Sequence, residues 1–165
     1  MYFDSQCSDS KMGYQGVFDA ADYYGPDVVY LVLHGLSLPY FRGSFISLQA
    51  LRAVDQLNKT KTVEYLQILF DNQDLISGSP DTVSDADMIV ILTDFAVEVG
   101  FTEEEFLEEY NHPKTNQLCR HEMKMANDRG VYGGPWFVVN GMTVLDYYPY
   151  WDVEDWISLI DPLLG

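Results

Sequence analysis

The chain has 165 residues, of which 47% are hydrophobic and 15% aromatic, which is enough for one domain with a core of its own. Its 26 acidic and 9 basic side chains give a formal net charge of −17, which argues against nucleic acid and anionic lipid surfaces as partners. The longest apolar runs fall well short of the roughly 18 residues that a membrane-spanning helix needs, so no transmembrane segment is expected.

The first third of the chain predicts a parallel β-α-β unit. Residues 2–3 begin as a short strand, and residues 8–24 carry apolar and aromatic side chains at helical intervals until Gly25 ends the pattern. Residues 28–33 form a continuous β-branched and aliphatic run between turn residues. Such a run is typical of a strand that is buried on both faces.

From residue 43 to residue 129 the pattern is helical almost throughout. Thr102 followed by Glu105 forms a capping-box pattern, and the neighbouring acidic residues suit the positive end of a helix dipole. The expected helices cover residues 44–57, 63–70, 84–99, 103–110 and 114–128.

The last part of the chain predicts a hairpin followed by a helix. Asn140-Gly141 separates two β-like runs and is a strong signal for a tight antiparallel turn. Asp152 can cap a final helix whose apolar residues recur on one face. The aromatic stretch 146–151 is expected to pack the hairpin onto this helix, with a partner-recognition patch as the alternative.

The candidate reactive group is Cys7, in the sequence Cys7-Ser8-Asp9-Ser10 between the first strand and the first helix. A thiol at a helix N-terminus is placed to ionise, and the thiolate is the attacking species. Asp4 and Asp9 oppose this ionisation, so we expect a less acidic thiol than in a strong oxidant. Ser10 can donate a hydrogen bond to the thiolate but cannot take over a mixed disulfide, which a second cysteine in its place would do.

Several stretches together resemble the DsbA-like branch of the thioredoxin superfamily, and most closely its eukaryotic members with degenerate active sites. The resemblance implies an α/β thioredoxin fold, β-α-β … β-β-α, with an inserted helical domain. Its thioredoxin-fold parts would be residues 1–42 and 130–165, and the helical insertion residues 43–129. The stretches that carry it are Cys7-Ser8-Asp9-Ser10, Leu36-Ser37-Leu38-Pro39-Tyr40, Gly130-Val131-Tyr132-Gly133-Gly134-Pro135 with Phe137-Val138-Val139-Asn140-Gly141, and residues 156–164.

The same resemblance implies a substrate platform. It predicts a cis peptide bond before Pro135, with the backbone of Gly134 facing Cys7 and free to pair with an extended substrate peptide. Ser8 and Asp9 are expected to contribute to the same surface. Gly134 stands where a β-branched residue is common in the family, which leaves a looser backbone and a smaller contact surface.

The expected function is therefore that of a monothiol thiol-disulfide oxidoreductase. Cys7 would form mixed disulfides with glutathione or a client protein, and an outside thiol would release them, giving reductase, isomerase or deglutathionylation activity. No bound cofactor is expected, and glutathione is the possible co-substrate. Two alternatives stay open: a redox-inactive peptide-binding or scaffold protein that uses the same groove, and a glutathione-binding protein like the kappa-class transferases, which share this architecture.

No metal site is expected. Cys119 with His112 and His121 is the nearest to a ligand set, but Cys119 and His121 lie two residues apart on a helical pattern and so point to different faces. A structural thiol is the preferred interpretation of Cys119. The acidic stretch 71–81 lacks the ligand spacing of a calcium loop, and we expect a solvated loop there.

The location is inferred from one weak signal. Asn58-Lys59-Thr60 is a glycosylation sequon between two predicted helices, where a surface loop is expected. The chain opens inside its first predicted strand without a signal peptide, so we expect a mature or trimmed form of a longer precursor. The sequon favours the secretory pathway, in the endoplasmic reticulum lumen or outside the cell, and the missing signal peptide is uninformative in a trimmed chain. The oligomeric state stays open.

Overall fold

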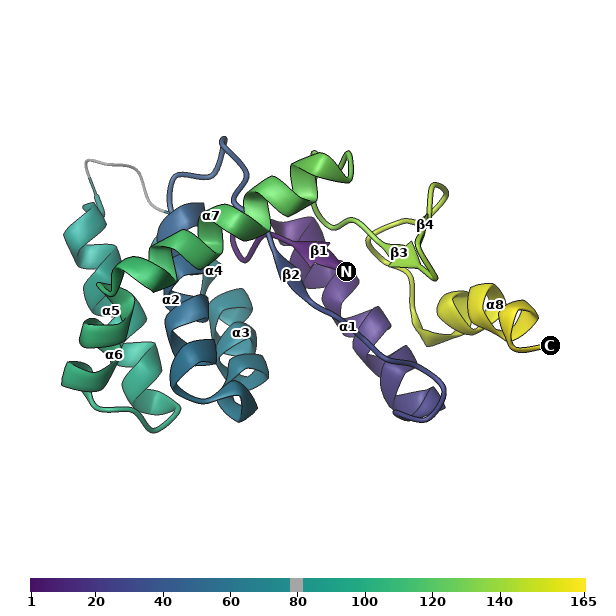
Figure 1. Cartoon of the computed structure of the whole chain (residues 1–165), viewed down its shortest axis with the longest axis horizontal. Helices are drawn as coiled ribbons and strands as arrows, with labels where there is room; N and C mark the ends of the chain where they lie inside the picture. The colour runs from purple at the N-terminus through teal and green to yellow at the C-terminus, as the bar shows by residue number, and fades with distance from the viewer. Residues whose placement is uncertain (78–81) are drawn as a thin grey trace.

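The computed structural model describes residues 1–77 and 82–165, and Figure 1 shows their arrangement. Helices α2, α3, α5 and α6 gather at one end of the molecule, while α1, the strands and α8 occupy the other. Helix α7 runs from one end to the other. In chain order the elements are β1 Tyr2–Phe3, α1 Ser8–Tyr24, β2 His34–Gly35, α2 Ser44–Leu57, the 3-10 helix η1 Lys59–Lys61, α3 Thr62–Asp71, α4 Gln73–Ile76, α5 Asp85–Glu98, α6 Glu103–Tyr110, α7 Pro113–Asp128, β3 Val138–Val139, β4 Met142–Thr143 and α8 Val153–Leu164.

The strands lie in the order that the sequence predicts. β1 pairs with β2 in parallel, with Tyr2 opposite His34, and β3 pairs with β4 in an antiparallel hairpin. An isolated bridge between Tyr2 and Trp136 joins the two pairs, so β1 stands between β2 and the residues that lead into β3. The α/β fold, β-α-β … β-β-α with a long helical region between its halves, is thereby confirmed.

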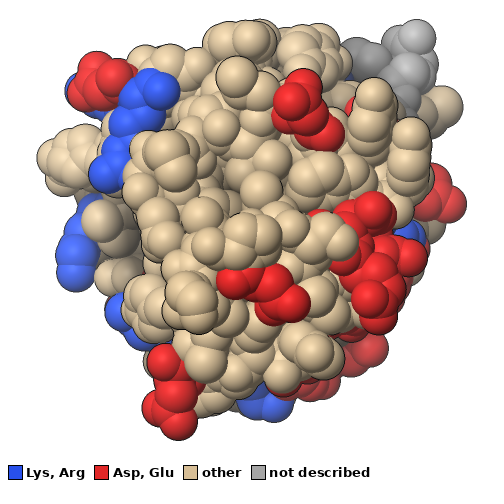
Figure 2. Space-filling model, turned by 90° about the vertical axis from the view of Figure 1, so that its right-hand side faces the viewer, with Lys and Arg blue, Asp and Glu red and all other residues tan. Residues whose placement is uncertain are grey.

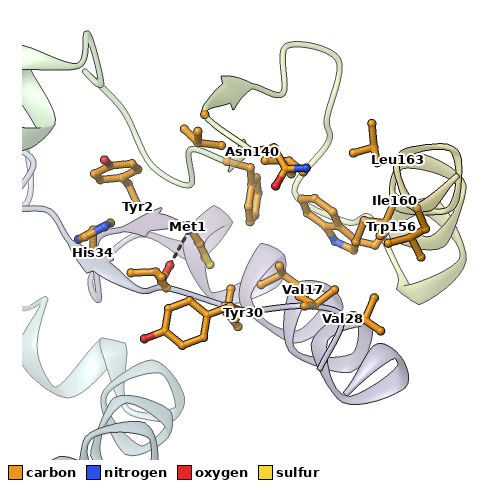
Figure 3. Close-up of a pocket in the computed structure, with 18 of the residues that line it drawn as sticks. Met1, Tyr2, Val17, Val28, Tyr30, His34, Asn140, Trp156, Ile160 and Leu163 are labelled. Atoms are coloured by element: carbon orange, nitrogen blue, oxygen red, sulfur yellow. Dashed lines mark hydrogen bonds between the residues drawn. The ribbon is translucent and has the colours of Figure 1, made fainter. Parts of the chain in front are cut away.

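The prediction of a buried strand over residues 28–33 is wrong. Pairing with β1 begins only at His34, and Tyr30 is 88% exposed, Val28 48% and Val32 40%. The amino group of Met1 donates to the carbonyl of Val32 at 2.8 Å (Figure 3), and within the described residues no strand pairs with residues 28–31. A strand needs a partner, and this apolar run is instead partly exposed.

The predicted helices agree with the structure within one residue at either end. The capping box of α6 is also present, since Glu105 N–H donates to Thr102 Oγ1 at 3.2 Å while the Glu105 carboxylate accepts from Thr102 N–H at 2.8 Å. The expected solvated loop over 71–81 is corrected in part: α3 extends to Asp71 and α4 follows it, while residues 78–81 lie outside the described part of the chain. None of the helices within residues 1–77 and 82–165 is long and apolar enough to cross a bilayer.

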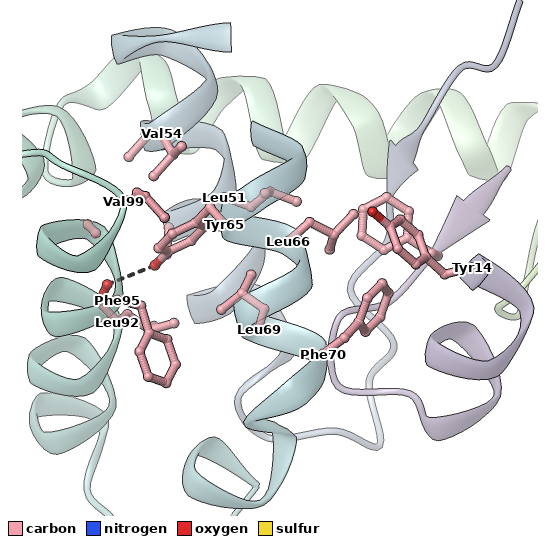
Figure 4. Close-up of a cluster of buried hydrophobic side chains, with 14 of the residues drawn as sticks. Tyr14, Leu51, Val54, Tyr65, Leu66, Leu69, Phe70, Leu92, Phe95 and Val99 are labelled. Carbon is pink, nitrogen blue, oxygen red and sulfur yellow. Dashed lines mark hydrogen bonds between the residues drawn. The ribbon is translucent and has the colours of Figure 1, made fainter. Parts of the chain in front are cut away.

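The main hydrophobic core ties the helical region to the first strand and helix (Figure 4). Leu66 and Leu69 of α3 are fully buried, and Tyr65 donates its hydroxyl to the carbonyl of Leu92 on α5 at 2.8 Å. Burial raises the pKa of Tyr65 well above its usual range, so the hydroxyl stays a donor. On the other side of α3, the Phe70 ring lies 5.1 Å from that of Tyr14 in α1. α3 thus anchors the helix that carries Cys7.

Candidate active site

Cys7 occupies the N-cap position of α1, where β1 turns into the helix. Its backbone is extended, with φ −87° and ψ 122°, its N–H donates to the carbonyl of Asp4 at 3.0 Å, and its own carbonyl accepts the N–H of Lys11 at 3.1 Å. The thiol therefore lies at the end of a helix where unpaired N–H groups and the helix dipole favour negative charge. Cys7 is 6% exposed, so it sits at the inner edge of the site.

The turn that holds Cys7 is tied to the helical region by two glutamines, Gln73 of α4 and Gln6 of the turn itself. Gln73 of α4 donates from Nε2 to the carbonyls of Ser5 and Cys7 at 2.9 and 3.0 Å. Gln6 donates its own Nε2 to Ser47 of α2 at 3.3 Å. Sequence reasoning missed Gln73, because a glutamine in a helical pattern carries no local signal of such a contact. These hydrogen bonds fix the position of the thiol relative to the helical region.

The loop before β3 lies directly across from Cys7. The Gly134–Pro135 peptide bond is cis, and the Cys7 thiol donates a hydrogen bond to the carbonyl of Gly134 at 3.4 Å. Trp136 and Tyr2 exchange two backbone hydrogen bonds of 2.7 and 2.9 Å, which hold this loop beside β1. The hydroxyl of Tyr147 donates to the carbonyl of Pro135. The structure thus places Gly134 and Pro135 against the thiol, although 127 residues separate Cys7 from Gly134.

Ser10 lies beneath this contact, one turn into α1. Its side chain is fully buried, and its Oγ accepts the N–H of Asp4 at 3.2 Å. A Cβ added to Gly134 would lie 3.1 Å from the same Oγ, so glycine at this position is what lets the loop come so close to Ser10. The Cys7 thiol donates to Gly134, and a hydrogen bond from Ser10 to the thiolate stays a prediction. Ser8 and Asp9 are exposed on the first turn of α1, at the rim of the site.

Asp4 is the buried acid of the site. Its carboxylate is fully buried and accepts hydrogen bonds from the N–H groups of Gln6 at 2.8 Å and Leu38 at 2.7 Å, and from the hydroxyl of Ser44. Burial raises the pKa of Asp4, and the hydrogen bonds from Ser44, Leu38 and Gln6 lower it by a smaller amount. From the sequence, Asp4 was treated only as a negative charge near Cys7. In the structure its carboxylate also links the end of β1 by hydrogen bonds to α2 and to the segment after β2.

We expect Asp4→Asn to change how stability depends on pH. Because the folded pKa of Asp4 is raised above the usual value of 3.8, the native protein loses stability as pH rises from that value through the folded pKa. Each tenfold difference in proton affinity between the two states is worth about 1.4 kcal/mol. Urea unfolding between pH 4 and 7 should therefore favour the variant over the wild type more strongly as pH rises through the folded pKa of Asp4, and by a constant amount above it.

The control for this measurement is Asp9→Asn, which removes an exposed acid from the adjacent helix turn. If both variants change stability in parallel across the pH range, the effect comes from overall charge and not from the burial of Asp4. Such a result would contradict the role of Asp4 given above.

The aromatic residues before α8 are divided between packing and exposure. Tyr147 packs edge-on against Phe137 at 4.8 Å, and Trp151 packs against Trp156 at 5.1 Å. Burial raises the pKa of Tyr147, and the nearby charges of Asp9 and Cys7 raise it further. Tyr148 and Tyr150 stack on each other and are 56% and 71% exposed. Packing thus explains Tyr147 and Trp151, whereas Tyr148 and Tyr150 stay exposed.

The other candidates do not form a site. Cys119 is fully buried in α7, and burial raises the pKa of its thiol to about 12. His112 caps the same helix, with its Nδ1 accepting the N–H of Lys114 at 3.2 Å. Within the described residues, no group of three or more His, Cys, Asp or Glu side chains is placed to hold a metal ion. His34 stacks on Tyr2 with 4.8 Å between ring centroids.

Comparison with known proteins agrees with this architecture. Residues 78–156 match the DSBA-like thioredoxin domain family. A proposed protein-disulfide isomerase from Pseudomonas syringae is similar in structure at 17% identity and a TM-score of 0.82, over 96% of this chain and 90% of that one. DsbA from Klebsiella pneumoniae is similar at 20% identity and a TM-score of 0.69, over 99% of this chain and 86% of that one. A thioredoxin-like oxidoreductase from Silicibacter pomeroyi is similar at 20% identity and a TM-score of 0.70, over 99% of this chain and 83% of that one. No curated protein matches the sequence with significance.

The parallel β-α-β start, the β-β-α end and the proline loop that faces the N-terminal thiol define a thioredoxin-fold protein. The long helical region between the two halves narrows this class further. Residues 78–156 match the DSBA-like thioredoxin domain family, and the similar solved structures share the architecture of the whole chain, so the chain has a DsbA-like thioredoxin fold.

Proposed function

We propose that the protein exchanges disulfides through the single thiol Cys7, with Ser10 as partner of the thiolate and Gly134-Pro135 as the substrate platform. The observation that carries this proposal is the 3.4 Å contact between Cys7 Sγ and the Gly134 carbonyl. The Cys7 thiolate attacks one sulfur of a disulfide, forms a mixed disulfide with it and releases the other sulfur as a thiolate. A second, external thiol then attacks the mixed disulfide and restores Cys7.

The chain offers no second thiol for this last step. Ser10 occupies the position from which a cysteine would resolve the mixed disulfide. Cys119, the other cysteine of the chain, is fully buried, and its pKa of about 12 leaves almost no thiolate at neutral pH. The activity is therefore reduction, isomerisation or deglutathionylation, with glutathione as co-substrate, and not net oxidation of a client.

The surroundings of Cys7 indicate which disulfides it can meet. Because Cys7 is 6% exposed, a disulfide has to approach between the first turn of α1, with Ser8 and Asp9, and the Gly134 loop. Asp9 contributes negative charge there, in a chain with a net charge of −17. Neutral or basic protein clients and small disulfides are thus favoured over acidic ones.

The proposed location is the secretory pathway. The sequon residue Asn58 is exposed at the end of α2, and its Oδ1 accepts the N–H of Thr60 at 3.1 Å. A glycan at this position would extend into solvent. An oxidising compartment also supplies the disulfides that the proposed chemistry consumes.

Incubation with glutathione disulfide followed by intact-mass measurement tests the proposal. The wild type and Cys119→Ser should each gain the mass of one glutathione, and Cys7→Ala should gain none. Added dithiothreitol should remove the adduct.

Three outcomes would count against the proposal. An adduct that depends on Cys119 would place the reactive thiol elsewhere, and no adduct on the folded protein would leave a redox-inactive binding protein. Glutathione that binds without a covalent adduct would indicate the transferase-like alternative.

A further inference from the structure

A polar hollow on the outward face of α7 takes no part in the proposed reaction. Its lining contains none of the residues that form the site around Cys7. The hollow is lined by Pro113, Asn116, Gln117, Arg120, His121 and Lys124. Because these positions recur at intervals of three residues and one residue, they form a single stripe along the helix. We call this stripe the α7 basic face.

The inner face of α7 holds this stripe in place. Thr115 and Cys119 are fully buried, and Glu122 pairs with Arg52 of α2. On the α7 basic face, in contrast, Asn116 is half-buried and the other lining residues are exposed. The stripe is therefore presented to solvent by a helix that packs on α2 and β2.

Within the described residues, the cations of the α7 basic face have no acidic partner. The chain has nine Lys and Arg side chains, and those that form ion pairs are Lys11, Arg42, Arg52 and Lys61. In residues 1–77 and 82–165 the remaining ones form no ion pair, and all but Lys59 lie on α7 or directly after it, namely Lys114, Arg120, Lys124 and Arg129. Unpaired positive charge is thus concentrated at α7.

A helix face that is only solvated would be expected to carry acids in this chain. The chain has 26 acidic residues, and the first turns of α5, α6 and α8 are acidic. Among the described residues, the lining of the α7 basic face includes no Asp or Glu, and the exposed acid of α7, Asp128, is the last residue of the helix. In Figure 2, Lys and Arg side chains gather along the left edge, the side on which α7 crosses the front of Figure 1. This segregation indicates a surface for a negatively charged partner.

The spacing of the cations on the α7 basic face fits an acidic helix. Arg120 and Lys124 are four residues apart, so they lie on successive turns with about 6 Å between their Cβ atoms. A partner helix that lies along α7 with an acidic residue at every fourth position has the same spacing, and its carboxylates meet both cations. The guanidinium of Arg120 can donate two parallel N–H bonds to one carboxylate. The side-chain amides of Asn116 and Gln117 add hydrogen-bond donors beside this contact.

We propose that the α7 basic face docks an acidic helical segment of a partner protein. Nucleic acid also matches the positive charge, but it is a long polyanion that would extend past this face onto the surface of a chain with a net charge of −17. A short acidic segment stays within the face. Because charges more than about 8 Å apart are screened at physiological ionic strength, the cations that touch the segment decide the contact, and the distant acids of the chain do not.

The test uses the whole chain and a fluorescein-labelled peptide of four Glu-Ala-Ala-Gln repeats, with fluorescence anisotropy as readout. Lys124→Glu and Lys59→Glu change the net charge equally, but only Lys124 lies on the α7 basic face, so the two variants form a matched pair. We expect Lys124→Glu to bind the peptide about tenfold more weakly than the wild type, and Lys59→Glu to bind it as the wild type does. The affinity of the wild type should fall about tenfold between 20 and 150 mM NaCl. Cys7→Ala should bind as the wild type does, which separates this surface from the proposed redox function.

Thermal unfolding of each variant shows that any loss of binding is not a loss of fold. No binding of the peptide at millimolar concentration in 20 mM NaCl would overturn the proposal. Equal weakening by Lys124→Glu and Lys59→Glu would also overturn it, since the peptide would then respond only to net charge. A single-stranded oligonucleotide of the same charge that binds more tightly than the peptide would assign the face to nucleic acid. Salt-sensitive dimerisation of the chain that Lys124→Glu abolishes would assign it to a second copy, and either result would overturn the proposed occupant.

Discussion

Replacing Ser10 by cysteine should convert the protein from a monothiol to a dithiol enzyme. Residues three apart at a helix N-terminus are close enough for a disulfide, which spans Cα atoms about 4.4–6.8 Å apart. The new thiol would attack the sulfur of Cys7 in a mixed disulfide, close an internal disulfide and release glutathione. We therefore expect Ser10→Cys treated with glutathione disulfide to lose two hydrogens in mass and to carry no glutathione.

The same variant should reduce insulin with dithiothreitol as the electron donor, about tenfold faster than the wild type, because the mixed disulfide no longer waits for an outside thiol. Ser10→Ala is the matched control, since it also removes the oxygen that accepts Asp4 N–H but adds no thiol. If Ser10→Cys keeps a stable glutathione adduct on Cys7, the two positions are not in reach of each other. A thioredoxin-type geometry at the start of α1 would then be disproved.

The site could be predicted from the sequence where local chemistry decides the structure. Asn140-Gly141 gives a hairpin because both residues adopt positive φ, 48° and 84°, which few other residues tolerate. Cys7 was predicted at the start of a helix, and the structure has it at the N-cap of α1. The pairing of Cys7 with Gly134 came from the family resemblance, since no local pattern links positions so far apart in the sequence.

The errors have a common physical cause, which is that tertiary contacts outweigh local pattern. Residues 28–33 have strand-like composition, but a strand needs partners, and pairing with β1 reaches only as far as Val32. Asp4 was interpreted only as a negative charge near Cys7, and its burial was not predicted because acidic residues are mostly exposed. Its burial depends on hydrogen bonds from Leu38 and Ser44, which come from other elements. Gln73 was missed for the same reason.

Gly16→Ala should destabilise the protein more than any other single methyl group added to a glycine of α1. A Cβ at Gly16 would lie 2.0 Å from the carbonyl oxygen of Trp151, a backbone atom that cannot move without displacing the start of α8. Overpacking of this kind typically costs about 1–3 kcal/mol and occasionally more, and it outweighs the gain of roughly 0.5–1 kcal/mol from alanine in a helix. We expect a net loss of about 2 kcal/mol or more in urea unfolding.

Two other glycines serve as controls for this prediction. At Gly13 the added Cβ would meet ring atoms of Phe137 and Pro135 at 3.2 Å, and at Gly133 it would meet nothing within 4 Å. The expected order of stability is therefore Gly133→Ala nearest to the wild type, Gly13→Ala below it and Gly16→Ala lowest. A Gly16→Ala protein as stable as Gly133→Ala would show that the Trp151 carbonyl, at the start of α8, does not lie against Gly16 of α1.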